Sequence, residues 1–201
     1  MDTKASNFFS MLSRMKYINR WGLMRNTITE NIAEHSLDVA IIAHALVVIS
    51  NTYFGGNFNA ERAAVLALFH DASEIITGDL PTPIKYFAPE IKDAYKNVEG
   101  HAKVQLTKTL PEEMKETYLS IMDEPLDGKG READLWRFVK AADKLSAYIK
   151  CLEEKRMGNK DFEKAEKSTL KAVKDMKMQG VDYFLKVFMP GYSLTLDDQG
   201  K

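Results

Sequence analysis

The chain has 201 residues, of which 45% are hydrophobic and 28% are charged, and its formal net charge is −1. This length allows one domain with a sizeable core, and we expect a single domain over residues 1–201. The near-neutral charge gives no general positive field for a nucleic acid polymer or an anionic membrane. The single cysteine, Cys151, excludes an intrachain disulfide and is expected to be a small hydrophobe in a helix.

No targeting or membrane segment is expected. The first six residues lack the basic and then apolar order of a signal peptide. The most apolar stretch, 39–49, is shorter than the roughly 20 residues that a bilayer span requires. The sequence therefore predicts a cytoplasmic protein without a membrane partner.

Helical spacing of apolar residues dominates the first half of the chain. It predicts a short helix from Phe8 to Met15, followed by a less regular segment over 17–30. Asn31 is then expected to cap a long central helix that ends near Ser50, with Glu34 as its capping-box partner.

Helices continue through the rest of the chain. Asn59 is expected to cap a helix that runs to His70-Asp71, after which Pro81 and Pro83 should stop any helix within a loop over 77–83. Later helices are predicted over about 89–110, 111–122, 131–157 and 161–178, with a last short one before Pro190. Because no alternating strand pattern occurs, the predicted fold class is all-α, a compact multi-helix bundle.

His70, Asp71 and Glu74 form the strongest local signal for chemistry. On a continuing helix these three ionisable side chains would share one face beside an apolar segment. Imidazole and carboxylate are both ligands of divalent transition metals, so a metal site would explain them. The alternative is a hydrogen-bonded core histidine beside a charge at the end of a helix.

The other histidines differ in their expected roles. His35 lies in the first turn of the central helix, where it could be a metal ligand or a half-exposed residue. His44 lies nine residues further on and points to the opposite side, so it cannot bind the same metal and is expected in the core or at a helix interface. His101, in a charged segment, is expected at the surface.

Asp143 is the remaining carboxylate of interest. It lies among small and apolar residues of the predicted helix 131–157, which suggests that its carboxylate faces a specific partner or ligand. An ion pair with Lys140 or Lys144 accounts for it equally well.

In their order along the chain, His35, His70-Asp71 and Asp143 resemble the metal-binding residues of the HD-domain metal-dependent phosphohydrolases. Several further segments resemble the bacterial HD-domain 5'-deoxynucleotidases of the YfbR type, from about Phe8 to the C-terminus. These segments are Asn19-Arg20-Trp21, 34–37, 70–74, 77–83 and 148–154, of which the stretch from Gly78 to Pro83 is the most specific. Lys144 departs from the small or apolar residue that is expected after Asp143.

This resemblance implies an HD-domain bundle that removes the 5'-phosphate of deoxyribonucleoside 5'-monophosphates and discriminates against ribonucleotides. It implies a homodimer and one divalent ion of cobalt, manganese, copper, nickel, iron or zinc. The implied metal ligands are His35, His70, Asp71 and Asp143, and of these His35, Asp71 and Asp143 would also contact the substrate.

The resemblance implies roles for further residues. Arg20 would orient the phosphate, Trp21 would pack where a 2'-hydroxyl would sit, and Glu74 would assist the attacking water. Asp71 would be a catalytic residue together with Glu74 and Arg20. The substrate would also be held by Asp79, Leu80, Pro81 and Thr82. A ligand set of two imidazoles and two carboxylates leaves positions for water and substrate, as hydrolysis requires.

Two other functions are compatible with parts of this pattern. An HD-type hydrolase could act on a triphosphate, a cyclic dinucleotide or an alarmone, although the chain lacks the basic cluster that several phosphates usually require. A nucleotide-binding HD module without enzymatic activity is disfavoured by the intact metal set and Glu74. Glu74 itself could be a general base or a support for His70.

Overall fold

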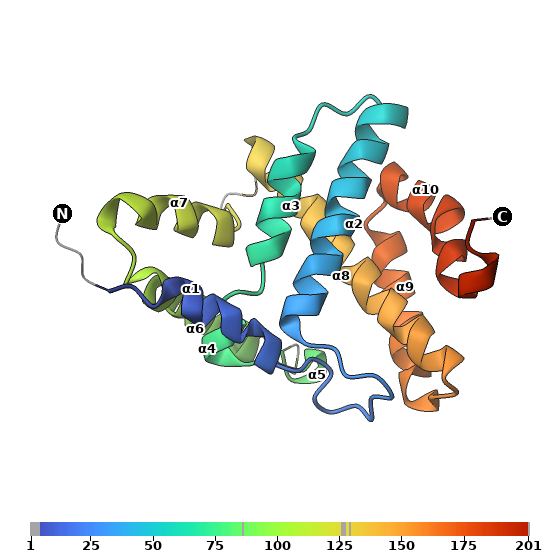
Figure 1. The fold of residues 1–201 in the computed structure, drawn as a ribbon, viewed down its shortest axis with the longest axis horizontal. Helices are drawn as coiled ribbons and strands as arrows, with labels where there is room; N and C mark the ends of the chain where they lie inside the picture. The colour runs from blue at the N-terminus through green and yellow to red at the C-terminus, as the bar shows by residue number, and fades with distance from the viewer. Residues whose placement is uncertain (1–4, 86, 126–127, 129, 201) are drawn as a thin grey trace. The chain divides into compact units, whose positions relative to one another are not determined.

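A computed structural model describes residues 5–85, 87–125, 128 and 130–200 of the chain (Figure 1). Within these residues the fold is helical, and the one extended pairing that occurs there is an isolated antiparallel bridge between Asn19 and Asn31. The all-α prediction is therefore confirmed. The α-helices are α1 (Phe8–Leu12), α2 (Ile32–Tyr53), α3 (Ala60–Phe69), α4 (Glu74–Thr77), α5 (Thr82–Lys85), α6 (Pro89–Thr107), α7 (Glu112–Met122), α8 (Gly130–Arg156), α9 (Glu163–Asp175) and α10 (Gln179–Val187).

The chain divides into two compact units, Met1–Leu37 with Leu68–Gly128 and Asp38–Ala67 with Lys129–Lys201. Helices α2 and α3 each contribute residues to both units. The expectation of a single domain stays a prediction.

The first unit is built around α6, which packs against α1, α4, α5 and α7. Phe8 of α1 is fully buried, and its ring lies 4.7 Å from that of Tyr118 on α7. Phe69 contacts the same tyrosine ring at 5.9 Å. These aromatic contacts hold the end of α3 in the first unit, directly before His70.

The second unit is built around α8, which packs along α9 (Figure 1). Cys151 lies on a helix, α8, as predicted, and it is buried there. At the end of α8, Lys150 forms a buried ion pair with Glu154, and the Asn159 side chain donates to the other oxygen of Glu154 at 2.7 Å. Lys150 and Glu154 therefore help to fix the turn that follows α8, a structural role that the sequence did not reveal.

Side-chain caps begin α2 and α3 as predicted. Asn31 Oδ1 accepts from the backbone N–H of Glu34 at 3.0 Å, and Glu34 Oε2 accepts in return from the N–H of Asn31 at 3.3 Å. Asn59 Oδ1 accepts from the N–H of Arg62 at 2.7 Å. Each side chain satisfies an N–H group that the first turn of a helix leaves without an intrahelical partner.

The helix boundaries differ from the predictions at two places. Helix α3 ends at Phe69, and residues 70–73 form a tight turn before α4, so the predicted helix does not continue through His70 to Glu74. The expectation that the prolines stop any helix is also wrong, because α5 contains Pro83 at its second position. Proline is tolerated there, since the first N–H groups of a helix have no intrahelical acceptor.

Helix α2 is longer than the apolar stretch suggested. Its 22 residues are long and apolar enough, by length and composition alone, to cross a membrane. However, 56% of its apolar window is buried inside the protein, as is usual for the core helix of a globular domain.

Candidate metal centre

Three predicted ligands come together in the first unit. One donor atom from each of His35, His70 and Asp71 lies within 4.8 Å of the other two. Asp71 Oδ2 lies 3.6 Å from His35 Nε2 and 3.1 Å from His70 Nε2. His35 is fully buried, and the His70 side chain is only 9% exposed. Two imidazoles and a carboxylate that converge in this way fit a divalent transition metal.

Two local structures position these ligands. His35 lies in the first turn of α2, directly after the capping box of Asn31 and Glu34. His70 and Asp71 lie in the turn between α3 and α4, where the N–H of Glu74 donates to the carbonyl of Asp71 at 2.9 Å. A turn, rather than a continuous helix, therefore brings His70, Asp71 and Glu74 together.

Glu74 is a buried carboxyl group beside this cluster, with 8% of the residue exposed. Its pKa is raised from the ordinary 4.5 to about 10, first by burial and then by the negative charges of Asp71 and Asp79. The cations Arg20 and Lys85 act in the opposite direction. A carboxyl group so perturbed beside three potential ligands is typical of a functional site.

Trp21 adopts an unusual backbone conformation, with φ of 60°. Bulky residues rarely occupy this left-handed region, so the surrounding contacts must hold it there. The N–H of Trp21 donates to Asp79 Oδ2 at 3.2 Å, and its carbonyl accepts from the N–H of Met24 at 2.8 Å. The predicted substrate residues Trp21 and Asp79, which are 58 positions apart, are thus in direct contact.

The predicted substrate loop is held by α6. The Gly78 carbonyl accepts from the hydroxyl of Thr77 at 3.0 Å and from that of Tyr95 at 3.2 Å. Leu80 and Pro81 are half-buried, whereas Thr82 is exposed at the start of α5. The Pro81 carbonyl accepts from the N–H groups of Ile84 and Lys85, which closes this short helix.

Lys85, Tyr95 and Glu30 were not identified from the sequence. Lys85 Nζ lies 3.0 Å from Glu99 Oε1 and 5.0 Å from the ring centre of Tyr95. Glu30 lies opposite Arg20 in the loop before α2, where the N–H of Arg20 donates to the Glu30 carbonyl at 2.9 Å. No periodic pattern marks these residues, because segments distant in sequence bring them to the site.

The other candidates lie elsewhere. Asp143 is half-buried on α8 in the second unit, and its role as a ligand stays a prediction. His44 is exposed on α2, so the expectation that it lies in the core is wrong. His101 is exposed as predicted, and its ring Nδ1 lies 2.7 Å from the Asn97 carbonyl.

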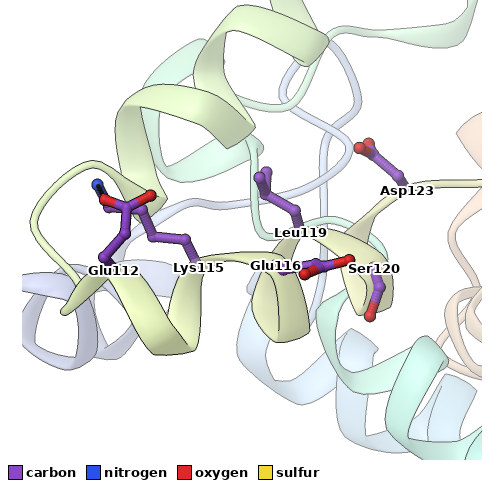
Figure 2. A pocket seen from close by; sticks show the side chains of 6 residues that line it. All are labelled: Glu112, Lys115, Glu116, Leu119, Ser120 and Asp123. Atoms are coloured by element: carbon purple, nitrogen blue, oxygen red, sulfur yellow. Dashed lines mark hydrogen bonds and ion pairs between the residues drawn. The ribbon is translucent and has the colours of Figure 1, made fainter.

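A groove of about 580 Å³ runs along α7 and contains none of the predicted site residues (Figure 2). Lys115 and Glu112 form an ion pair at one end of it, with 2.6 Å between Nζ and Oε2. The groove is lined by Glu112, Lys115, Glu116, Leu119, Ser120 and Asp123. It is an open surface of mixed charge without a convergent set of buried polar groups, so it is not the candidate site.

Comparisons with known proteins show the family of this chain. The family described as 5'-deoxynucleotidase YfbR-like matches residues 7–192. A 5'-deoxynucleotidase of Photorhabdus laumondii is 52% identical over 193 residues, which cover 96% of each chain. The 5'-deoxynucleotidase YfbR of Shigella boydii is 48% identical over 195 residues, 97% of this chain and 96% of the relative.

Solved structures share the fold. An HD-domain phosphohydrolase from Listeria innocua has a TM-score of 0.77 at 25% identity, over 92% of this chain and 88% of its own. The HD phosphohydrolase DatZ of cyanophage S-2L, bound to dA and one catalytic Zn²⁺, has a TM-score of 0.63 at 21% identity, over 92% and 96%. With nearly the whole length matched by close relatives, the chain belongs to the YfbR-like family of 5'-deoxynucleotidases.

Proposed function

We propose that the protein is a metal-dependent 5'-deoxynucleotidase that converts deoxyribonucleoside 5'-monophosphates into deoxyribonucleosides and phosphate. The observation that carries this proposal is the convergence of His35, His70 and Asp71 within 4.8 Å. A buried carboxyl group, Glu74, lies beside this cluster in a chain about 50% identical to curated 5'-deoxynucleotidases.

The donor set fits one divalent ion of cobalt, manganese, copper, nickel, iron or zinc. The three atoms come from two neutral imidazoles and a carboxylate, ligands that these ions accept. Asp143 is proposed as the fourth ligand, following the order of the family motif. When bound, such an ion supplies the Lewis acidity that activates water and polarises the phosphoryl oxygens.

Glu74 and Arg20 are the proposed catalytic side chains around this ion. Glu74 would be favoured in its charged form by a divalent cation held at this site, which opposes the effect of burial on its pKa. The resulting carboxylate can accept a proton from the attacking water. Arg20 carries a planar guanidinium, which suits a phosphate group and can hold it for attack.

Trp21 and the residues from Asp79 to Thr82 are proposed to hold the deoxynucleoside. The hydrogen bond from Trp21 N–H to Asp79 Oδ2 joins these two segments at 3.2 Å. An apolar pocket alone rejects an added hydroxyl by only about 100-fold. Strong discrimination against ribonucleotides therefore needs a steric block, for which the ring of Trp21 is the proposed source.

We also propose that the protein is a cytoplasmic homodimer. Support for self-association comes from one face of α2, where Ile41 is 60% exposed and Val48 is 43% exposed. His44 is exposed between them at helical spacing. A second copy would cover this apolar face through a two-fold interface, the commonest arrangement in homodimers.

A substrate panel tests the proposed activity. Protein stripped with a chelator is expected to be inactive and to regain phosphate release from dAMP when one of the six metal ions is added. AMP, dATP, a cyclic dinucleotide and an alarmone serve as competing substrates. Equal release from AMP and dAMP, or a faster reaction with any of the other three, would contradict the proposal.

A further inference from the structure

Glu30 ends the irregular segment that carries Arg20 and Trp21. The backbone of this segment is closed by the bridge between Asn19 and Asn31 and by a 2.9 Å hydrogen bond from Ile32 N–H to the Ile18 carbonyl. These contacts place Glu30 directly opposite Arg20 and five residues before His35. The Glu30 side chain is only 12% exposed, so its carboxylate requires partners within the protein.

One oxygen of Glu30 binds both residues proposed to contact the substrate. The indole Nε1 of Trp21 donates to Oε2 at 2.9 Å, and Arg20 Nη1 donates to the same oxygen at 3.3 Å. An indole N–H can only donate, and an arginine cannot lose its charge, so a buried carboxylate suits both. The Glu30 carboxylate therefore orients the ring of Trp21 and the guanidinium of Arg20 together.

The other oxygen of Glu30 faces the metal cluster. Oε1 lies 3.7 Å from His35 Nδ1, whereas His35 Nε2 is the ring nitrogen on the side of Asp71. A histidine that ligates a metal through one nitrogen usually directs the other N–H at a carboxylate, which fixes the tautomer and the ring orientation. Glu30 lies on this side of the His35 ring, at 3.7 Å, which is an ion-pair distance and longer than a hydrogen bond.

We infer that Glu30 is a positioning residue that couples the metal ligand His35 to the substrate contacts Arg20 and Trp21. The inference rests on the proposed function and adds a residue to it. One buried carboxylate sets the ring of His35 and, through its second oxygen, the two side chains expected to face phosphate and sugar. A change at Glu30 should therefore affect metal affinity and sugar selectivity together, although Glu30 is expected to contact neither the metal ion nor the substrate.

The test uses Glu30→Gln, which keeps the size of the side chain and removes its charge. Binding of Mn²⁺ and of Co²⁺ to the metal-free protein is measured by equilibrium dialysis. A loss of about 10- to 100-fold in metal affinity is expected, the usual effect of removing a carboxylate partner of a ligating histidine. At saturating metal, kcat/KM for dAMP is expected to fall and the preference for dAMP over AMP to narrow.

Glu34→Gln is the matched control. Glu34 is exposed in the same first turn of α2, and its side chain accepts from the N–H of Asn31. A variant that perturbs only this helix start is expected to keep metal affinity and sugar preference within about twofold of wild type. Far-UV circular dichroism of both variants verifies that the helices form.

A second comparison separates positioning from general stability. In an Arg20→Ala background, Glu30→Gln is expected to weaken metal binding as before but to lower kcat/KM at saturating metal by a smaller factor than in wild type, because residues that act through one another are not additive. Glu30→Asp keeps the charge and is expected to recover part of the metal affinity, which also provides a folded variant if Glu30→Gln does not fold.

The outcomes distinguish this inference from the proposed function. If wild type hydrolyses dAMP and folded Glu30→Gln matches it in metal affinity and sugar preference, the role of Glu30 is wrong. Equal losses in Glu34→Gln would also overturn it, because they would trace the effect to the start of α2. If wild type releases no phosphate from dAMP with any metal, the proposed function fails, while the dialysis still tests the link between Glu30 and His35.

Discussion

At the scale of single residues, Glu74 combines two conflicting environments. Burial and the neighbouring carboxylates of Asp71 and Asp79 favour its protonated form in the metal-free protein, with a pKa of about 10. Burial also raises the pKa of Asp79. The positive charge of a bound metal would reverse this preference, so metal binding and deprotonation of Glu74 are expected to be linked.

Metal-free protein should therefore lose stability as the pH rises. The folded state holds a proton on Glu74 that the unfolded chain releases above its ordinary pKa of 4.5, so the free energy of unfolding falls between pH 4.5 and about 10. Glu74→Gln removes this dependence and is expected to unfold at a higher temperature than wild type at pH 8. A gain of about 1 kcal/mol corresponds to roughly 2–4 °C in a chain of this size.

Thermal unfolding of chelator-treated protein at pH 6 and pH 8 measures this effect. Glu90→Gln, an exposed carboxylate in the first turn of α6, is the control and should follow wild type. The assigned environment of Glu74 would be wrong if Glu74→Gln retained the full pH dependence. The same variant should bind metal but release little phosphate, as expected for a proton acceptor rather than a ligand.

At the scale of secondary-structure elements, three parts of α2 have different roles. Its first turn carries His35, its buried face contributes to the core, and its exposed face carries Ile41, His44 and Val48. Exposed apolar residues in a row along a helix are typical of a surface that another chain covers. His44, which the sequence places in the core or between helices, is exposed on this face.

Ile41→Glu is accordingly expected to convert a dimer into a monomer. A charge at the centre of a two-fold apolar interface is opposed by its own copy and loses its hydration, so the monomer should predominate at micromolar concentration. Sedimentation velocity measures the mass, with Leu68→Glu as an exposed apolar control on α3. A dimer that persists in Ile41→Glu would place the interface on another surface.

Element boundaries were predictable where a side chain satisfies the backbone locally. Asn31 with Glu34 and Asn59 gave the starts of α2 and α3, because caps act within three residues. The turn over 70–73 and the short helix α5 were not predictable in this way. The turn depends on the packing of Phe69 against α7, and α5 has a proline in its first turn. The spacing of residues in the sequence does not distinguish the turn from a continuous helix, or a proline that begins a helix from one that ends it.

At the scale of the whole molecule, the family match spans residues 7–192 and so includes both compact units. The local grouping of His70, Asp71 and Glu74 was detectable from the sequence, whereas His35 joined it chiefly by resemblance. Glu30 was missed, since its partners at positions 20, 21 and 35 face it only after the loop closes. Tertiary contacts of this kind leave no periodic trace in the chain.

Asp143→Ala tests whether the second unit supplies a metal ligand. Loss of a ligand is expected to lower metal affinity by at least the 10- to 100-fold typical of a supporting partner, and to abolish phosphate release. Metal content by elemental analysis and helical content by circular dichroism are measured together. Lys144→Ala is the control, because side chains at adjacent helical positions point in different directions. Unchanged metal content in Asp143→Ala would show that Asp143 is not a metal ligand.

The left-handed backbone of Trp21 carries a conformational cost at the residue proposed to determine sugar selectivity. A side chain in this region costs about 1–2 kcal/mol, which glycine would not incur. Selection for thermal stability alone would therefore favour glycine there, and on the proposed role of Trp21 the product would be a more stable enzyme with weaker sugar discrimination. If Trp21 has its proposed role, a tryptophan at this position favours sugar discrimination at the cost of backbone strain.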